Sequence, residues 1–386
     1  MMGVRGRFAA VTVALLALAG CTAQPAAPAG TGSPGTDPAV TRYAAPAADG
    51  DCSSGDPCAI TDAVAGARPG DDVELADGDY GDLGLRVAGG TEAAPIRIEP
   101  AAGAVARFGE LRISTPHLQW SGVLVTGAWF LDDGAQGTEV VGVHIDGGGL
   151  FVRTEDVVVR DSLIENGSSI DGIQIASASR VLIQGNTIRD FDQAVDNGRH
   201  ADCIQLFDIE DVTIRANRIS DCYNAGIIIS GGGRGINDLL IEANFVQGCA
   251  PVSDACGGGS TAELREPGAR GLVVRNNTFL DGSVRWGSVD GNVFDRNIVD
   301  YLSECTSVVS NTIVANWNRK MCATPTWSAV DGNRTAEVEF VDRAAGELYP
   351  SDPAAVRIAG TGSASPADAD IDGAALPADV AGATPG

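Results

Sequence analysis

The 386-residue sequence is poor in aromatic residues and lacks paired metal-binding cysteines. Phe, Trp and Tyr make up only 5% of the chain, which argues against a binding surface made of stacked aromatic rings. The nine cysteines form no Cys-x-x-Cys pair, so we do not expect a zinc site. The formal net charge of −25 argues against nucleic acid as a partner, and it disfavours polyanions unless cations or a local arginine patch intervene.

The N-terminal segment is expected to direct export. Two arginines precede an apolar run over residues 8–19, which is too short for a stable membrane span, and no later segment could form one. The run ends in Leu18-Ala-Gly-Cys21, which resembles the bacterial lipobox. This resemblance implies that residues 1–20 are a lipoprotein signal peptide and that Cys21 is lipidated. We therefore expect a protein anchored to the outer face of the cytoplasmic membrane, on the extracellular or periplasmic side.

Composition divides the rest of the chain into three parts. Residues 21–50 are rich in Ala, Pro, Gly and Thr, cannot bury a core, and are expected to form a disordered, flexible tether. Residues 51–373 are expected to form one domain that acts as a monomer, and residues 374–386 are expected to form a flexible tail.

A motif of the form Val-x-Ile-x-x-Asn-x-Ile recurs through the middle of the chain. Its asparagines are Asn186, Asn217, Asn244 and Asn277, with weaker copies around Ser162, Asn292 and Asn311. Apolar residues alternate at i and i+2, which is strand spacing, and the repeat length is typical of a solenoid. We therefore predict an all-β parallel β-helix with three short strands per coil. Stacked asparagines about 4.8 Å apart would form a hydrogen-bonded ladder in it.

Eight cysteines remain after Cys21, an even number that predicts disulfides in an oxidising compartment. Neighbours in sequence suggest the pairs Cys52–Cys58, Cys203–Cys222, Cys249–Cys256 and Cys305–Cys322. A rival pairing joins Cys222 to Cys249, because both follow their repeat by the same offset and should lie in adjacent coils.

Two terminal segments resemble those of a known superfamily. Residues 59–80 are similar to the segment of secreted β-helix proteins in which a short helix caps the open end, and residues 342–373 are similar to their exit segment. Together with the repeats, they resemble the pectin-lyase-like right-handed parallel β-helix superfamily. The resemblance implies a single-stranded, three-sheet solenoid with an N-terminal capping helix. It also implies a site on the outer face of the sheet that precedes each Asn motif.

The spacing of apolar residues predicts which side chains lie on that outer face. Ile173, Ile204 and Leu264 each precede an Asn motif by eight residues, so we expect them to point inward. The residues that follow them would then point outward in one row, which Arg285 continues. The predicted row is Gln174, Gln205, Arg265 and Arg285.

The segment Arg265-Glu-Pro-Gly-Ala-Arg270 resembles the Arg-x-Pro-x-x-Arg signature of the pectate lyase family. The resemblance implies that Arg265 is the base that takes the C5 proton of the sugar and that Arg270 positions the site. An arginine base needs a strongly lowered pKa. The structural alternative is that both arginines pair with carboxylates.

A second candidate site lies at Arg199-His200-Ala-Asp202. A histidine in a loop beside the outer face can act as a general base near neutral pH. Asp171 and Asp202 begin equivalent strands 31 residues apart, so they should be neighbours that share a Ca²⁺ ion or have a raised pKa. The alternative is that both cap turns through backbone amides. The predicted substrate-binding residues are Gln174, Gln205, Arg199 and Arg285.

These residues favour a polysaccharide lyase that acts on a uronic-acid polymer. β-Elimination needs a cation near the sugar carboxylate, a base at C5 and help for the leaving oxygen. A C5-epimerase shares the first proton abstraction. The alternatives are a glycoside hydrolase that uses Asp171 and Asp202, or a non-catalytic protein that binds carbohydrate or cell wall.

Overall fold

The computed structural model describes residues 38–193, 200–249, 259–287, 291–303, 309–315, 332–359 and 364–386. Several predicted features lie outside these residues: the signal peptide, Cys21, most of the tether, Arg199, Cys256, Cys305 and Cys322. Within the described ranges, no helix is long and apolar enough to cross a membrane.

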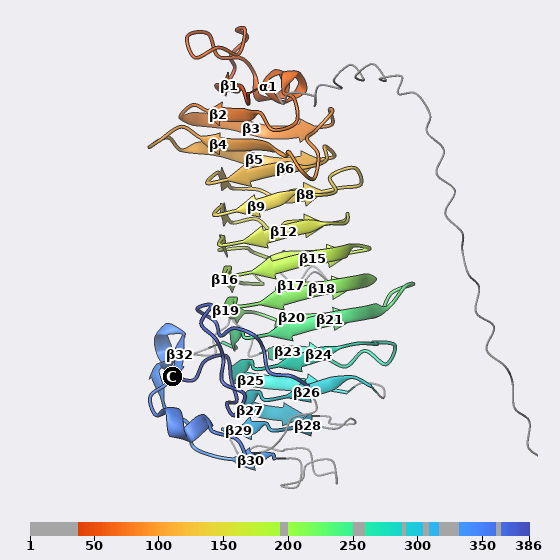
Figure 1. The fold of residues 1–386 in the computed structure, drawn as a ribbon, viewed down its shortest axis with the longest axis vertical. Helices are drawn as coiled ribbons and strands as arrows, with labels where there is room; N and C mark the ends of the chain where they lie inside the picture. The colour runs from red at the N-terminus through yellow and green to blue at the C-terminus, as the bar shows by residue number, and fades with distance from the viewer. Residues whose placement is uncertain are drawn as a thin grey trace, which may run out of the picture. The chain divides into compact units, whose positions relative to one another are not determined.

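Short parallel strands stack coil upon coil from β2 to β29, as Figure 1 shows. A twelve-stranded sheet forms one face of the coils. Its strands are β1 (Thr41–Ala44), β2 (Asp72–Leu75), β4 (Ile96–Pro100), β6 (Leu118–Ser121), β9 (Glu139–Val141), β12 (Val157–Arg160), β15 (Ser179–Gln184), β18 (Ile209–Arg215), β21 (Ile236–Glu242), β24 (Val273–Arg275), β26 (Val293–Asp295) and β28 (Val309–Ser310).

An eighteen-stranded sheet supplies the other two faces, because most coils contribute two strands to it. The strands of one face are β7 (Leu124–Val125), β10 (His144–Asp146), β13 (Leu163–Glu165), β16 (Thr187–Phe191), β19 (Arg218–Cys222), β22 (Phe245–Gln247), β29 (Ile313–Val314) and β30 (Arg334–Thr335). Those of the other are β8 (Trp129–Leu131), β11 (Leu150–Val152), β14 (Ile173–Ala176), β17 (Asp202–Phe207), β20 (Ala225–Ser230) and β23 (Ser260–Leu264). The longer strands β3 (Gly78–Leu85), β5 (Ala106–Ile113), β25 (Thr278–Trp286) and β27 (Ile298–Ser303) run across both.

The predicted asparagine ladder is present and buried. The amide of Asn186 donates to Asn217 at 3.0 Å, Asn217 donates to Asn244 at 3.0 Å, and Asn244 donates to Asn277 at 2.9 Å. The ladder continues from Asn277 to Asn297, at 3.1 Å. Each amide thereby satisfies a polar group that the coil would otherwise bury unpaired. The three-faced parallel β-helix predicted from the repeat is confirmed.

The ends of the solenoid differ from the expected boundaries. The predicted tether ends too late, because β1 pairs in parallel with β2 and so belongs to the first coil. The short helix α1 (Ile60–Gly66) buries Ile60, Ala63 and Val64 in the core near β1 and β2, and its capping role stays a prediction.

The predicted flexible tail is also wrong, since Val380, Ala381 and Ala383 are buried in an apolar cluster with Ile298 and Ile313. These last residues pack there because their side chains are apolar. Residues 340–356, which precede them, contain the 3-10 helices η2 (Arg343–Ala345) and η3 (Pro353–Val356) and the antiparallel pair of β31 (Phe340–Asp342) and β32 (Glu347–Pro350).

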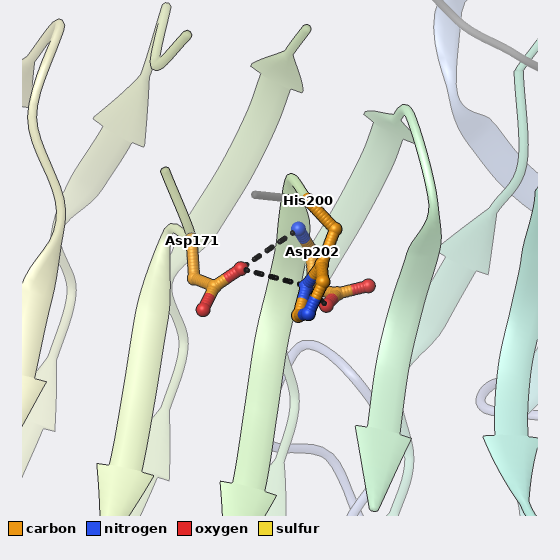
Figure 2. Close-up of side chains that lie close together, drawn as sticks. All are labelled: Asp171, His200 and Asp202. Atoms are coloured by element: carbon orange, nitrogen blue, oxygen red, sulfur yellow. Dashed lines mark hydrogen bonds and ion pairs between the residues drawn. The ribbon is translucent and has the colours of Figure 1, made fainter. Parts of the chain in front are cut away.

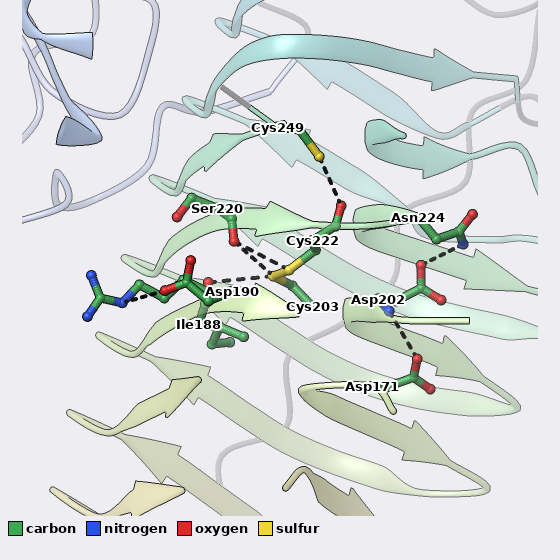
Figure 3. The surroundings of a disulfide bond; sticks show 10 residues. Asp171, Ile188, Asp190, Asp202, Cys203, Ser220, Cys222, Asn224 and Cys249 are labelled. Atoms are coloured by element: carbon green, nitrogen blue, oxygen red, sulfur yellow. Dashed lines mark hydrogen bonds and ion pairs between the residues drawn. A yellow bond between two sulfur atoms is a disulfide. The ribbon is translucent and has the colours of Figure 1, made fainter. Parts of the chain in front are cut away.

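Two of the predicted disulfides are present, Cys52–Cys58 and Cys203–Cys222. The rival pairing of Cys222 with Cys249 is wrong, because Cys222 is bonded to Cys203. Cys249 is also disulfide-bonded. Figure 3 shows the Cys203–Cys222 bond beside Asp202, joining β17 to β19.

Candidate active site

Strand register brings Asp171 and Asp202 together. Gln174 in β14 pairs with Gln205 in β17, and Asp171 and Asp202 each lie three residues before these glutamines, so the two aspartates occupy equivalent positions in adjacent coils. The backbone amide of Asp202 donates to Oδ1 of Asp171 at 3.1 Å. Gly172 permits this close approach, because a Cβ atom there would lie 2.7 Å from a backbone oxygen of the next coil.

His200 lies over this pair of carboxylates. Its Nδ1 atom is 2.8 Å from Oδ2 of Asp202 and 3.8 Å from Oδ1 of Asp171 (Figure 2). The His200 side chain is 47% exposed, whereas that of Asp202 is fully buried. Because the buried carboxylate accepts a hydrogen bond from Nδ1, the Nε2 atom of His200 is left free of its proton and can act as a base.

The remaining oxygens of the two carboxylates are also hydrogen-bonded. Gln174 Nε2 donates to Oδ2 of Asp171 at 3.0 Å and contacts Oε1 of Gln205 at 3.0 Å. Asn224 Nδ2 donates to Oδ1 of Asp202 at 2.7 Å. These amides fix the orientation of both carboxylates.

Burial and mutual repulsion disfavour the charged forms of these aspartates. Burial, followed by the charge of Asp171, raises the pKa of Asp202 to about 6. Burial likewise raises the pKa of Asp171, against the hydrogen bonds from Asp202 and Gln174 that lower it. Raised carboxylate pKa values beside a cavity are typical of functional sites.

The site opens into a cavity of about 600 Å³. Its polar wall consists of Ser169, Asp171, Gln174, His200 and Gln205, and its apolar wall consists of Ala128, Phe130, Phe151, Ile170 and Phe207. Although the chain has few aromatic residues, three of its ten phenylalanines gather at this one cavity, a placement that composition does not report. The alternation within Trp129-Phe-Leu131 and Leu150-Phe-Val152 is the signal that places Phe130 and Phe151 outward.

The outward row differs from the predicted one at Arg265. Ile228 pairs with Glu263, and Glu263 pairs with Arg285, so Glu263 holds the position that was predicted for Arg265. We call the observed set the outward row; its members are Arg112, Phe130, Phe151, Gln174, Gln205, Ile228, Glu263 and Arg285.

Arg265 and Arg270, the two arginines of the Arg-x-Pro-x-x-Arg segment, lie away from the His200 site. Arg265 follows Glu263 by two residues and bonds to its carboxylate, with Nη2 to Oε2 at 2.9 Å. This bond raises the pKa of Arg265, which opposes a role as base. Arg270 pairs with Asn237 beside the twelve-stranded sheet. Glu263 lies two coils beyond Gln205, about 10 Å along the axis.

The donor set at Asp171 and Asp202 fits Ca²⁺ poorly. Calcium takes six to eight oxygen ligands. Here each of the four carboxylate oxygens faces an N–H donor, and a histidine nitrogen is the third ligand atom within 4.8 Å. We therefore derive no chemical step through a metal ion.

The comparisons with known proteins concern the fold. The crystal structure of pectate lyase Pel9A is similar over 90% of this chain and 89% of that one, with 17% identity and a TM-score of 0.42. The PL6 family alginate lyase AlyGC is similar over 81% of this chain and 55% of that one, with 16% identity and a TM-score of 0.42. An alginate lyase from Paenibacillus sp. str. FPU-7 is similar over 77% and 95%, with 17% identity and a TM-score of 0.41.

No curated protein matches the sequence of this chain. The family model described as "Right handed beta helix region" matches residues 126–320, which is more than half of the 386 residues and includes the whole His200 site. The chain belongs to this right-handed β-helix family.

Proposed function

We propose that this chain cleaves an acidic polysaccharide by β-elimination, with His200 as the base. The observation that carries the proposal is the pairing of an exposed histidine with a fully buried aspartate at the wall of a cavity. Such a pair holds one imidazole nitrogen as a proton acceptor and stabilises the imidazolium ion that forms.

The elimination then proceeds in a sequence that balances protons and electrons. Nε2 of His200 takes the C5 proton of a uronate unit, and the electrons of the C5–H bond form the C4–C5 double bond. The C4–O4 glycosidic bond breaks with its electron pair on O4, and the imidazolium ion gives the proton from C5 to O4. Asp202 holds the imidazole in position, Asn224 orients the Asp202 carboxylate, and Gln174 orients the carboxylate of Asp171, which accepts from the backbone amide of Asp202. Gln205 lines the cavity, where its amide can bind sugar hydroxyl groups.

A C5-epimerase shares the first step and differs in returning the proton to C5. The hydrolase hypothesis has less support, because a nucleophile or acid must reach the glycosidic bond. The side chains of Asp171 and Asp202 are 7% and 0% exposed, and His200 lies over them. Only a measurement of turnover distinguishes the non-catalytic binding hypothesis from the enzymatic ones.

The experiment is a survey of ultraviolet absorbance from unsaturated product, with pectate, alginate and glycosaminoglycans as substrates. Absorbance that appears with the native protein and disappears with His200→Ala supports the lyase. The matched control is His144→Ala, since His144 also lies beside a carboxylate but on β10, on another face. Silence across the whole panel with folded protein contradicts the lyase, and reducing ends released without absorbance support the hydrolase.

The membrane anchor and the calcium site remain predictions. Cys21→Ser should move the protein from the membrane fraction to the soluble fraction if Cys21 carries lipid. Chelation of divalent cations should leave turnover unchanged if the hydrogen-bonded carboxylates need no ion. A loss of turnover that Ca²⁺ restores would contradict the poor fit described above.

A further inference from the structure

A cluster of aromatic and arginine side chains lies next to the His200 site and has no role in the proposed chemistry. Arg112, Phe130 and Phe151 hold successive positions of the outward row. The rings of Phe130 and Phe151 are stacked, with centroids 4.9 Å apart and planes inclined by 21°. The guanidinium carbon of Arg112 lies 4.0 Å from the Phe130 centroid, and that of Arg153 lies 5.1 Å from it.

Arg153 retains the hydrogen-bonding capacity to receive a ligand. Its Nη1 contacts Oδ1 of Asp132 at 3.5 Å, whereas Arg112 holds Oδ2 of the same residue at 2.8 Å and also contacts Glu110 at 3.3 Å. A guanidinium has five N–H groups, so most of those on Arg153 are unused within the described part of the chain. Arginine binds carboxylates through two parallel hydrogen bonds, which suits it to a second carboxylate.

This cluster is continuous with the active site. Phe130 and Phe151 line the cavity that also contains His200. Phe151 pairs with Gln174, and Gln174 pairs with Gln205, so Phe151 lies two coils, about 10 Å, from Gln205 along the axis. An extended glycan that passes His200 along the outward row therefore reaches Phe151 and Arg153.

Resting on the proposed function, we propose that Phe130, Phe151 and Arg153 form a subsite for a carboxylated sugar unit next to the unit that reacts at His200. The apolar C–H face of the sugar ring packs against the phenylalanines, and its carboxylate bonds to Arg153. A local cation is needed here because the chain as a whole, at −25, repels polyanions. The subsite thus confers selectivity for acidic over neutral glycans.

The test measures binding to full-length protein that carries His200→Ala, so that no ligand is consumed. Oligogalacturonate, oligoalginate and a glycosaminoglycan oligosaccharide are each compared by calorimetry with the same molecule after reduction of its carboxylates to neutral sugars. One acidic ligand should bind about tenfold more tightly than its reduced counterpart, or about 1.4 kcal/mol. Adding Arg153→Ala should abolish this preference, and adding Phe151→Ala should weaken both ligands.

The matched control is Arg97→Ala, which removes an exposed arginine, paired with Asp72, from the twelve-stranded sheet and should leave both affinities unchanged. The subsite is overturned if no ligand of the panel binds, or if the preference survives Arg153→Ala. Its failure is distinct from failure of the lyase. Arg153-dependent binding without any unsaturated product overturns only the lyase, and turnover with an unchanged KM in Arg153→Ala overturns only the subsite.

Discussion

Two histidines of this chain lie beside carboxylates in very different surroundings. His144 Nε2 is 3.0 Å from Oε1 of Glu165, and His200 Nδ1 is 2.8 Å from Oδ2 of Asp202. Glu165 also accepts a hydrogen bond from Arg189 at 2.9 Å, so a cation balances its charge. Asp202 instead lies beside a second carboxylate and is fully buried.

The two histidine–carboxylate pairs have similar distances and differ in their neighbours. A carboxylate that is already balanced by arginine gains little from a protonated imidazole. The Asp202 carboxylate is fully buried beside Asp171, and the charge that His200 carries once it has taken a proton lowers the pKa of this carboxylate. Chemistry is therefore expected at His200.

The largest expected effect separates the two histidines directly. His200→Ala removes the general base and should lower the turnover rate by about 10²- to 10⁴-fold. His144→Ala should change it by less than about twofold, since His144 lies on β10, where its ring faces Glu165 of β13 on another face of the coil. The initial rate at which each purified variant forms unsaturated product tests this prediction. Equal losses of rate in the two variants would contradict the assignment of His200 as the base.

Asp202→Asn should lower turnover nearly as much while it preserves shape. Asn224 donates to Oδ1 of Asp202, so the new amide keeps its oxygen there and turns its NH₂ group toward His200. Nδ1 of His200 must then accept a hydrogen bond, which places the proton on Nε2, the wrong tautomer for a base. We expect a loss of about 100-fold or more in kcat; a variant with native kcat would exclude the dyad.

The raised pKa of Asp202 also predicts a pH dependence. Activity needs the ionised carboxylate, so the rate should fall as pH falls through about 6. The pH dependence of folding stability has the opposite sign to that of the rate. Between the ordinary pKa of 3.8 and about 6 the folded protein holds more protons than the unfolded chain, so stability falls as pH rises through this window.

Thermal unfolding of the native protein and Asp202→Asn across this range should show the variant gaining relative stability toward pH 7, on the order of 1–3 kcal/mol. The native protein supplies the reference at each pH. A difference that does not vary with pH would contradict the raised pKa.

The sequence predicted this site better than it predicted the arginines, for a physical reason. Strand spacing fixes inward and outward positions, so the 31-residue interval between Asp171 and Asp202 was enough to make them neighbours. The eight-residue offset that placed Arg265 assumed turns of constant length. Strand pairing from Ile204 through Ile227 shows that Ala262 is the equivalent inward residue in the coil of Arg265. Ala262 precedes Leu272 by ten residues instead of eight, because the turn between them is two residues longer. Surface turns tolerate such insertions without cost to the core.

Gly172→Ala should weaken the site through the backbone. The new Cβ atom would lie 2.7 Å from the oxygen of Cys203 and 2.9 Å from Ile188, so the coils must separate at Asp171. Overpacking of this kind costs about 1–3 kcal/mol and should lower turnover as well. Gly84→Ala is the matched control in β3, since a Cβ atom there meets nothing within 4 Å. Chemical denaturation of both variants, with product rates, tests the difference.

The smallest expected effect concerns the pair of His144 and Glu165, where we expect no chemistry. Glu165→Gln removes the charge that His144 and Arg189 share, but Arg189 also contacts Asp190 at 3.4 Å and is half exposed. The Glu165 side chain is only 12% exposed, but its partners His144 and Arg189 are 39% and 47% exposed. Ion pairs that solvent screens in this way contribute about 0–1 kcal/mol, so the unfolding free energy should change by about 1 kcal/mol. Turnover should stay at the native level. A large loss of activity in Glu165→Gln would show that burial and crowding do not distinguish the two histidines, because the balanced pair would then matter as much as the unbalanced one.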